Sequence, residues 1–119
     1  MRRAITNTEL LETISFLKAK ARSNHAKIWS LAAEQLSRPR RARALLNLNH
    51  IARATDADSV ILIPGKVLGS GTVNHRVIIG AFEYSKAARI KIEQAGGHCM
   101  SLRDFVERYP EGSNVKIMR

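Results

Sequence analysis

The fold is decided by the stretch SVILIPGKVLGSGTVNHRVIIGAF, residues 59–82. It contains two apolar runs rich in β-branched residues, SVILIP and RVIIGAF, separated by PGKVLGSG (residues 64–71), a segment that crowds three glycines and a lysine. Continuous runs of this kind are typical of strands that are buried on both faces of a sheet. We therefore expect two well-buried strands, the first closed by Pro64, on either side of a glycine loop.

Helix and strand signals alternate downstream of this stretch. Ser85 is a suitable N-cap for a helix that the next glycine pair would end. A short strand is expected at residues 98–100, followed by a helix that Ser101 caps and Pro110 stops. The alternating pattern of residues 115–118 predicts a last strand. The second half of the chain is thus expected to be a compact α/β unit.

The first half is expected to be helical. Thr6 and Glu9 fit a capping box at the start of a helix over about residues 7–22. A second helix over about residues 25–36 should stop near Pro39, because the residue before a proline avoids helical geometry. After the proline, the helical spacing of Leu45, Leu48, Ile51 and Ala52 indicates a third helix that ends before TDADS. We divide the chain, as one structural domain, into a basic helical region (1–57) and an α/β core unit (58–119).

Charge is abundant and uneven. The chain carries 20 Lys and Arg against 10 Asp and Glu, a formal net charge of +10. Residues 1–55 hold 11 basic and 3 acidic side chains, and residues 56–119 hold 9 and 7, so the net charges are +8 and +2. Such an excess is self-repulsive unless an anion is bound. A polyanion is therefore the expected partner, and the first half is the expected contact surface.

The segment SRPRRARALLNLNH, residues 37–50, places Arg38, Arg40, Arg41 and Arg43 within six residues and offers no acidic side chain beside them. We expect these arginines in a loop and in the first turn of the third helix, where backbone amides favour an anion. The planar fork of arginine suits phosphates and guanine edges. A solvated basic loop is the alternative, but the pattern and the charge of the half-chain favour nucleic-acid contact.

The kind of nucleic acid follows from the connector and from the aromatic content. A connector with a proline and four arginines is too long and charged for the short turn of a helix-turn-helix. Aromatic residues make up only 5% of the chain, which argues against a single-strand binder that works by stacking. Trp29 has helical spacing with apolar neighbours and is expected in the core. Folded RNA, read by shape and backbone charge, fits best.

The loop from Gly65 to Gly71, with Lys66, supplies the one enzyme hypothesis, a nucleotide- or phosphate-binding site. Its spacing fits neither G-x-x-x-x-G-K-[ST] nor G-x-G-x-x-G. Three interpretations stay open: a nucleotide site, a plain connection between strands, and a contact to the RNA backbone, which we favour. Beside this loop, His75 and its neighbour Arg76 are either RNA contacts or exposed loop residues.

Other classes of site have little support in the sequence. The single cysteine, Cys99, cannot form an internal disulfide, which fits a reduced intracellular protein, and is expected to be a small buried side chain. The four histidines lie too far apart in sequence for local metal-ligand spacing, so no metal site is expected. No apolar run approaches the ~20 residues of a membrane span, and the N-terminus lacks the apolar region of a signal peptide.

Five motifs carry a resemblance to a known family: RPRR (38–41), NLNHI (47–51), IPGKVLGSG (63–71), FEYS (82–85) and YPEGSNVKIMR (109–119). Together they resemble the archaeal and eukaryotic large-subunit ribosomal protein family numbered eighteen, of the e-type, which is related to bacterial large-subunit ribosomal protein fifteen. The resemblance covers nearly the whole chain. The compact length, without a C-terminal extension, is similar to archaeal members.

The resemblance implies a structural constituent of the large ribosomal subunit that binds and scaffolds large-subunit ribosomal RNA. It implies no enzymatic activity, no cofactor, no small-molecule substrate and no membrane partner, a location on the cytoplasmic ribosome, and neighbouring ribosomal proteins as further partners. The family's second half is an irregular superhelix of β-β-α turns, which is the α/β architecture expected above. Together with the charge pattern, it gives these expected RNA-binding residues: Arg38, Arg40, Arg41, Arg43, Lys20, Arg22, Lys27, Asn47, Lys66, Gly69, Gly71, His75 and Arg76.

Overall fold

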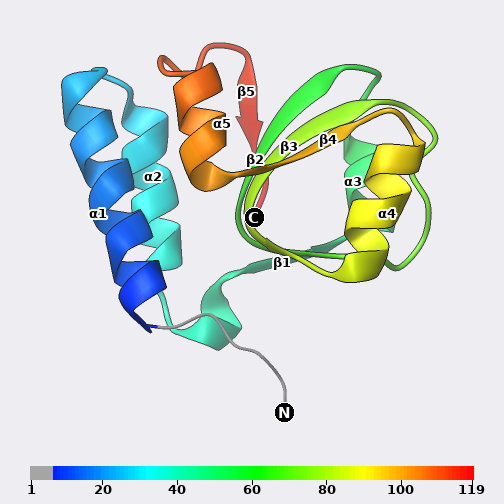
Figure 1. Cartoon of the computed structure of the whole chain (residues 1–119), viewed down its shortest axis with the longest axis horizontal. Helices are drawn as coiled ribbons and strands as arrows, with labels where there is room; N and C mark the ends of the chain where they lie inside the picture. The colour runs from blue at the N-terminus through cyan, green and yellow to red at the C-terminus, as the bar shows by residue number, and fades with distance from the viewer. Residues whose placement is uncertain (1–6) are drawn as a thin grey trace.

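Helices and strands alternate along the computed structural model of the chain, which describes residues 7–119 (Figure 1). In chain order the elements are α1 (Asn7–Ser23), α2 (Lys27–Leu36), the 3-10 turn η1 (Arg40–Ala42), β1 (Ala44–Asn47), α3 (Leu48–Ala54), β2 (Ser59–Leu68), β3 (Val77–Tyr84), α4 (Lys86–Gln94), β4 (His98–Ser101), α5 (Leu102–Arg108) and β5 (Val115–Ile117). The α/β class and the order of elements after residue 58 confirm the prediction.

All pairs in the sheet are parallel, and the strand order is β1-β2-β3-β4, with β5 also paired to β2. β1 lies beside the second half of β2, where Ala44 is opposite Gly65. β5 lies beside the first half, where Val60 is opposite Val115. The two short strands therefore share one edge of β2. This edge brings residues from the N-terminal half of the chain into the sheet.

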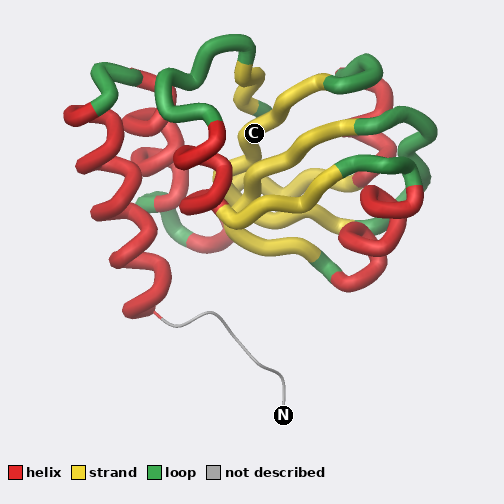
Figure 2. The backbone as a smooth tube through the Cα atoms, turned by 45° about the horizontal axis from the view of Figure 1, so that its top comes forward, coloured by secondary structure: helices red, strands yellow, loops and turns green. Residues whose placement is uncertain are grey.

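Helices lie on both sides of the sheet (Figures 1 and 2), and each face of the sheet has its own core. Ile61 and Ile63 of β2 pack with α3 and α4 on one face, while Leu62 packs with α1, α2 and α5 on the other. This alternation explains why the sequence of β2 from Val60 to Ile63 is continuously apolar, because both faces of the strand are buried. On the second face Trp29 stands edge-on to Phe105, with ring centroids 6.1 Å apart. The core position expected for Trp29 is confirmed.

Two of the expected helix caps are present. The Ser85 hydroxyl accepts a hydrogen bond from the amide of Ala88 at 3.1 Å, and the Ser101 hydroxyl accepts one from the amide of Asp104 at 3.2 Å. Side-chain caps of this kind satisfy amides that have no partner within the helix. The remaining cap, at Thr6, lies outside the described residues.

Pro64 does not close the first strand as the sequence suggested, because β2 continues to Leu68. The proline lies within a register shift against β3, between Ile63 and Lys66. Proline lacks an amide hydrogen, and it is tolerated in a sheet where the ladder is already interrupted. Gly65 and Lys66, which were expected in a loop, are therefore strand residues.

The third helix is present and ends before Thr55 as expected, but its predicted start was wrong. It begins only at Leu48, and the arginine run is followed by strand β1 rather than by a helical turn. Pairing of residues 44–47 with residues 65–68 of β2 overrides the helical spacing of the local apolar residues. Gly65 permits this pairing, because a Cβ there would collide with the carbonyl of Ala44. The expected anion site at a helix N-terminus is therefore absent from the arginine run.

Within the described residues, no helix combines the length and the apolar character needed to cross a membrane.

Candidate nucleic-acid interface

The arginine run lies in the exposed connector between α2 and β1. Arg38, Arg40 and Arg41 are exposed, and Arg43 is half-buried. The Nε of Arg43 donates a hydrogen bond to the carbonyl of Arg38 at 3.1 Å, which ties the two ends of the connector together. No arginine of the run forms an ion pair with any residue in the range 7–119. Their charges are therefore available to an external anion.

The sheet brings this connector to Lys66. Leu45, two residues after Arg43, is opposite Lys66 across β1 and β2, and Lys66 is opposite Glu83 across β2 and β3. Neighbouring strands lie about 4.8 Å apart, so the three residues form one row about 10 Å wide. The arginine run and Lys66, which are distant in sequence, thus meet at one surface.

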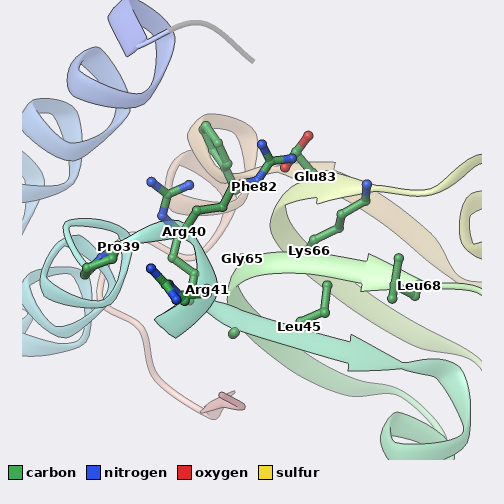
Figure 3. A pocket seen from close by; sticks show the side chains of 11 residues that line it. Pro39, Arg40, Arg41, Leu45, Gly65, Lys66, Leu68, Phe82 and Glu83 are labelled. Atoms are coloured by element: carbon green, nitrogen blue, oxygen red, sulfur yellow. The ribbon is translucent and has the colours of Figure 1, made fainter. Parts of the chain in front are cut away.

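This surface is hollowed into a pocket of about 780 Å³, here termed the arginine-lined pocket (Figure 3). Figure 3 shows the side chains of Leu45, Lys66, Leu68 and Glu83 standing on the same side of the strands. The residues that line the pocket are Pro39, Arg40, Arg41, Arg43, Ala44, Leu45, Gly65, Lys66, Leu68, Phe82 and Glu83.

The pocket exists because the helices cover only part of this sheet face. Val60 and Leu62, in the first half of β2, pack under the helices of the second core. Lys66 and Leu68 continue the same alternation in the second half of the strand, but neither belongs to a core cluster. Leu45 beside them is 60% exposed. The end of the sheet thus presents an apolar floor with cations along its rim.

Asn47 is the remaining predicted site residue near this pocket. It is exposed at the end of β1, opposite Leu68, and precedes α3 without a capping hydrogen bond from its side chain. Arg38 borders a neighbouring hollow that also contains Arg43 and Leu45. The pocket and this hollow therefore share the basic connector as a common wall.

The glycine loop does not have the form of a nucleotide site. Lys91 of α4 reaches back and donates from Nζ to the carbonyls of Gly69 and Gly71, both at 2.8 Å. Gly71 has φ +89°, and a Cβ there would collide with the side chain of Asn49. A phosphate loop leads from a strand into a helix, whereas this segment leads from β2 into β3. The segment therefore lacks the strand-to-helix form that the nucleotide-binding alternative requires.

Lys91 was missed by the sequence analysis. Nothing in the local sequence distinguishes it from a solvated lysine on a helix, because its partners lie about 20 positions away and meet it only when α4 packs over the loop. Gly69 also shows how closely α4 packs on the loop, because a Cβ on this residue would lie only 2.7 Å from the Cβ of Ala87 in α4.

His75 and Arg76 lie apart from the pocket. His75 Nε2 is 2.8 Å from the hydroxyl of Thr55. The Nη1 of Arg76 donates to Asp58 Oδ1 at 2.6 Å. Both residues precede β3, at the end of the sheet where β2 also begins. Arg76 thus has an ion-pair partner, which the arginines of the run lack within residues 7–119, and His75 has a side-chain hydrogen-bond partner.

Three of the predicted site residues, Lys20, Arg22 and Lys27, belong to the helical hairpin of α1 and α2, apart from the pocket. Lys20 Nζ lies 3.6 Å from Glu107 Oε2 and 5.7 Å from the centre of the Phe16 ring. Arg22 and Lys27 are exposed near the turn between α1 and α2. The arginine run follows the opposite end of α2, a helix of 10 residues and therefore about 15 Å long.

Cys99 has the character of a structural thiol. It is half-buried, and burial raises its pKa to about 11, against a smaller lowering by Arg89. A thiol with so high a pKa is almost entirely protonated near neutral pH and is a poor nucleophile. Nearby, burial also raises the pKa of Tyr84, whose hydroxyl lies 2.7 Å from the carbonyl of Met100.

Among residues 7–119, no group of three or more His, Cys, Asp or Glu side chains could hold a metal ion.

Comparison with known proteins identifies the family. Residues 24–100, which include the whole arginine-lined pocket, match the family of ribosomal proteins 50S-L15 and 50S-L18e, which also includes a protein of the 60S subunit. The large ribosomal subunit protein eL18 of Methanothermobacter thermautotrophicus is 45% identical over 113 residues, which cover 95% of this chain and 93% of that protein. The eL18 protein of Haloarcula marismortui is 41% identical over 114 residues, covering 96% and 97%. That of Pyrobaculum aerophilum is 36% identical over 113 residues, covering 95% and 93%.

These descriptions name ribosomal proteins and no enzyme, in agreement with the expectation of a structural protein. The identities extend over nearly the full length of each relative, and the family match spans α2 to β4. The resemblance seen in the five sequence motifs is thereby confirmed, and the chain belongs to this family of large-subunit ribosomal proteins.

Proposed function

We propose that the chain is a structural constituent of the large subunit of the cytoplasmic ribosome and that it binds and scaffolds large-subunit ribosomal RNA through the arginine-lined pocket. One observation carries the proposal. Arg40, Arg41 and Arg43 share a pocket with Lys66 from a distant strand, and none of these cations forms an ion pair within residues 7–119. Unpaired cations that are held close together attract a polyphosphate backbone.

The mechanism is neutralisation of phosphates from a rigid platform. A guanidinium donates two parallel hydrogen bonds to one phosphate, so each arginine fixes the direction as well as the position of the backbone. The sheet holds Lys66 in place through pairing with strands on both sides. Contacts of this kind set the register of the RNA and carry little sequence information.

Scaffolding requires more than one contact region. In this proposal the basic region, residues 1–57, supplies the arginine run, and the α/β unit, residues 58–119, supplies Lys66 and the platform. Lys20, Arg22 and Lys27, about 15 Å away at the other end of α2, would hold a second RNA segment. His75 and Arg76 would contribute only by giving up their present partners.

Sedimentation of a native lysate tests the assignment to the subunit. The chain should co-migrate with large subunits on a sucrose gradient in low salt, in a constant ratio to the RNA. Release in high salt would be consistent with phosphate contacts, because these weaken as salt competes for the backbone. A chain that stays at the top of the low-salt gradient would contradict the assignment.

Binding to transcribed large-subunit ribosomal RNA tests the site. Replacing Arg40 and Arg41 together by alanine should weaken binding broadly across RNA sequences. Arg53→Ala with Arg108→Ala is the matched control, since it removes the same charge from exposed positions outside the pocket. Equal losses for the two double variants would show that only net charge matters and that the pocket is not the site.

A further inference from the structure

Phosphate binding does not explain every feature of the arginine-lined pocket. Glu83 lines the pocket and is opposite Lys66 in the sheet, yet the two form no ion pair. Its carboxylate has no hydrogen-bond partner among residues 7–119 either. Glu83 is half-buried and its carboxylate repels phosphate, so a bound group that offers N–H donors complements it better than a phosphate does.

The apolar floor also points away from phosphate. Leu45 is 60% exposed, and Leu68 and Phe82 are half-buried in the lining of the same pocket. Burying such surface against a phosphate gains nothing, whereas the flat face of a nucleobase covers it and stacks on an aromatic ring. Among residues 7–119, Phe82 is the one aromatic side chain in the lining. The pocket therefore combines a cationic rim, an apolar floor and one acceptor.

We propose that the arginine-lined pocket holds the base of a single unpaired guanine nucleotide of the bound RNA. This inference rests on the proposed function. Guanine presents two adjacent N–H donors, N1 and N2, on its Watson–Crick edge, and a carboxylate accepts both at once. Adenine and cytosine each present one amino group there, and uracil one imide N–H. The phosphates on either side of the guanine then face Arg40 and Arg41 on the rim.

The size of the pocket is consistent with this occupant. Its volume is about 780 Å³, within the range of roughly 300 to 1,000 Å³ that is typical of small-molecule sites. The row of Leu45, Lys66 and Glu83 puts an apolar, a cationic and an anionic group side by side across three strands. An unpaired base with its sugar and phosphates presents the same three complementary surfaces.

Short RNA probes test the preference directly. Fluorescein-labelled pentaribonucleotides UUGUU, UUAUU, UUCUU and UUUUU are titrated with the full chain at 50 mM salt, and binding is followed by fluorescence anisotropy. UUGUU should bind about tenfold more tightly than the others, as expected for a bidentate contact to a base edge. Inosine in place of guanosine, which lacks the N2 amino group, should lose most of this advantage. Equal affinities for the four bases, or no binding of any, would overturn the proposal.

Glu83→Gln tests the residue. The amide keeps the shape of the side chain but replaces one acceptor oxygen by a donor, so the guanine preference should fall to about twofold or less. Affinity for UUUUU should stay the same or rise, because a negative charge is removed from a cationic surface. Glu111→Gln makes the same change at an exposed turn outside the pocket and should keep the preference. A guanine preference that survives Glu83→Gln would overturn the assignment.

The arginine variants separate this proposal from the function on which it rests. Arg40→Ala with Arg41→Ala should weaken all pentamers by a similar factor and leave the ratio between bases unchanged. If the arginine variant weakens ribosomal RNA binding but the wild type shows no base preference, the guanine pocket is wrong and the proposed RNA site stands. If ribosomal RNA binding is unaffected by the arginine variant, the RNA site itself is wrong.

Discussion

Leu45 of β1 is the parallel register partner of Lys66 of β2. This pairing extends the sheet at the edge of β2 with a strand from the N-terminal half of the chain, and it sets the arginine run beside a lysine from the other half. The arginine-lined pocket therefore depends on the pairing of β1 with β2.

Gly65→Ala should displace β1. The added Cβ would collide with the Ala44 carbonyl, and we expect a loss of about 1–3 kcal/mol in the free energy of unfolding, as for other overpacked sites. RNA affinity should fall as well, because Arg43 and Leu45 move with the strand. Urea unfolding and RNA titration measure the two effects. Gly96→Ala is the control: its φ of +83° makes alanine strained, but a Cβ there meets nothing within 4 Å, so RNA affinity should be unchanged.

Lys91→Met should loosen the loop that connects β2 and β3. The substitution keeps the apolar stem and removes the donor to the carbonyls of Gly69 and Gly71. We expect a loss of about 1–3 kcal/mol in stability, typical of charge-assisted hydrogen bonds, and faster amide hydrogen exchange over residues 69–76. Lys86→Met, at an exposed position of the same helix, should change neither quantity. Unchanged exchange in Lys91→Met would mean that the loop is held by other contacts.

Cys99 should react slowly with iodoacetamide in the folded chain. Its pKa is raised to about 11 from an ordinary value of 9.0, so at pH 8 the thiolate fraction is about 100-fold smaller than in a free cysteine. The reaction rate should rise tenfold per pH unit until the pH approaches 11. The urea-unfolded chain, which has the ordinary thiol, is the control and should react faster by a similar factor. Equal rates would contradict the raised pKa.

The raised pKa of Cys99 also predicts how the stability of the folded chain depends on pH. Because the folded pKa is higher than the unfolded one, the unfolded state loses its proton first as pH rises, so the Cys99 contribution is complete below about pH 9 and is lost as pH rises towards 11. Cys99→Ala should therefore show a weaker decline in unfolding midpoint between pH 9 and 11 than the wild type. Identical slopes would show that Cys99 does not contribute.

RNA affinity should depend steeply on salt. If ~6–10 phosphates are engaged, affinity falls ~10³- to 10⁵-fold between 50 and 200 mM salt. Arg40→Ala with Arg41→Ala should reduce the slope of log affinity against log salt by about two, one for each phosphate contact that is lost. Filter binding at four salt concentrations measures the slope. A slope unchanged by the double variant would show that these arginines do not meet phosphates.

Much of the fold could be predicted because its signals are local. The apolar runs on either side of the glycine loop formed buried strands, and Ser85 and Ser101 formed the expected caps. A cap depends on residues three positions apart, and a buried strand on its own run of apolar side chains. The uneven charge and the unpaired arginines were likewise visible in the composition of adjacent residues.

The errors occurred where distant segments pair. Leu45 has helical spacing with Leu48 and Ile51, and Pro64 has the chemistry of a strand end, but the structure at each is decided by β2 and its neighbours. Backbone hydrogen bonds to β2 outweigh the helical preference of a short apolar segment, because propensity differences amount to only tenths of a kcal/mol per residue. Pro64 is accommodated where the ladder shifts register.

The sequence by itself determined the α/β class, most element boundaries, the family and the basic first half of the chain. Only the tertiary structure decided which cations lie together: it placed Arg40, Arg41 and Arg43 in one pocket with Lys66, added Glu83 and Phe82, and gave Gly69, Gly71, His75 and Arg76 intramolecular partners. The physical reason is the separation along the sequence of the residues involved. Charge runs and helix caps depend on neighbouring residues, whereas a pocket is formed by side chains that meet only after the strands have paired.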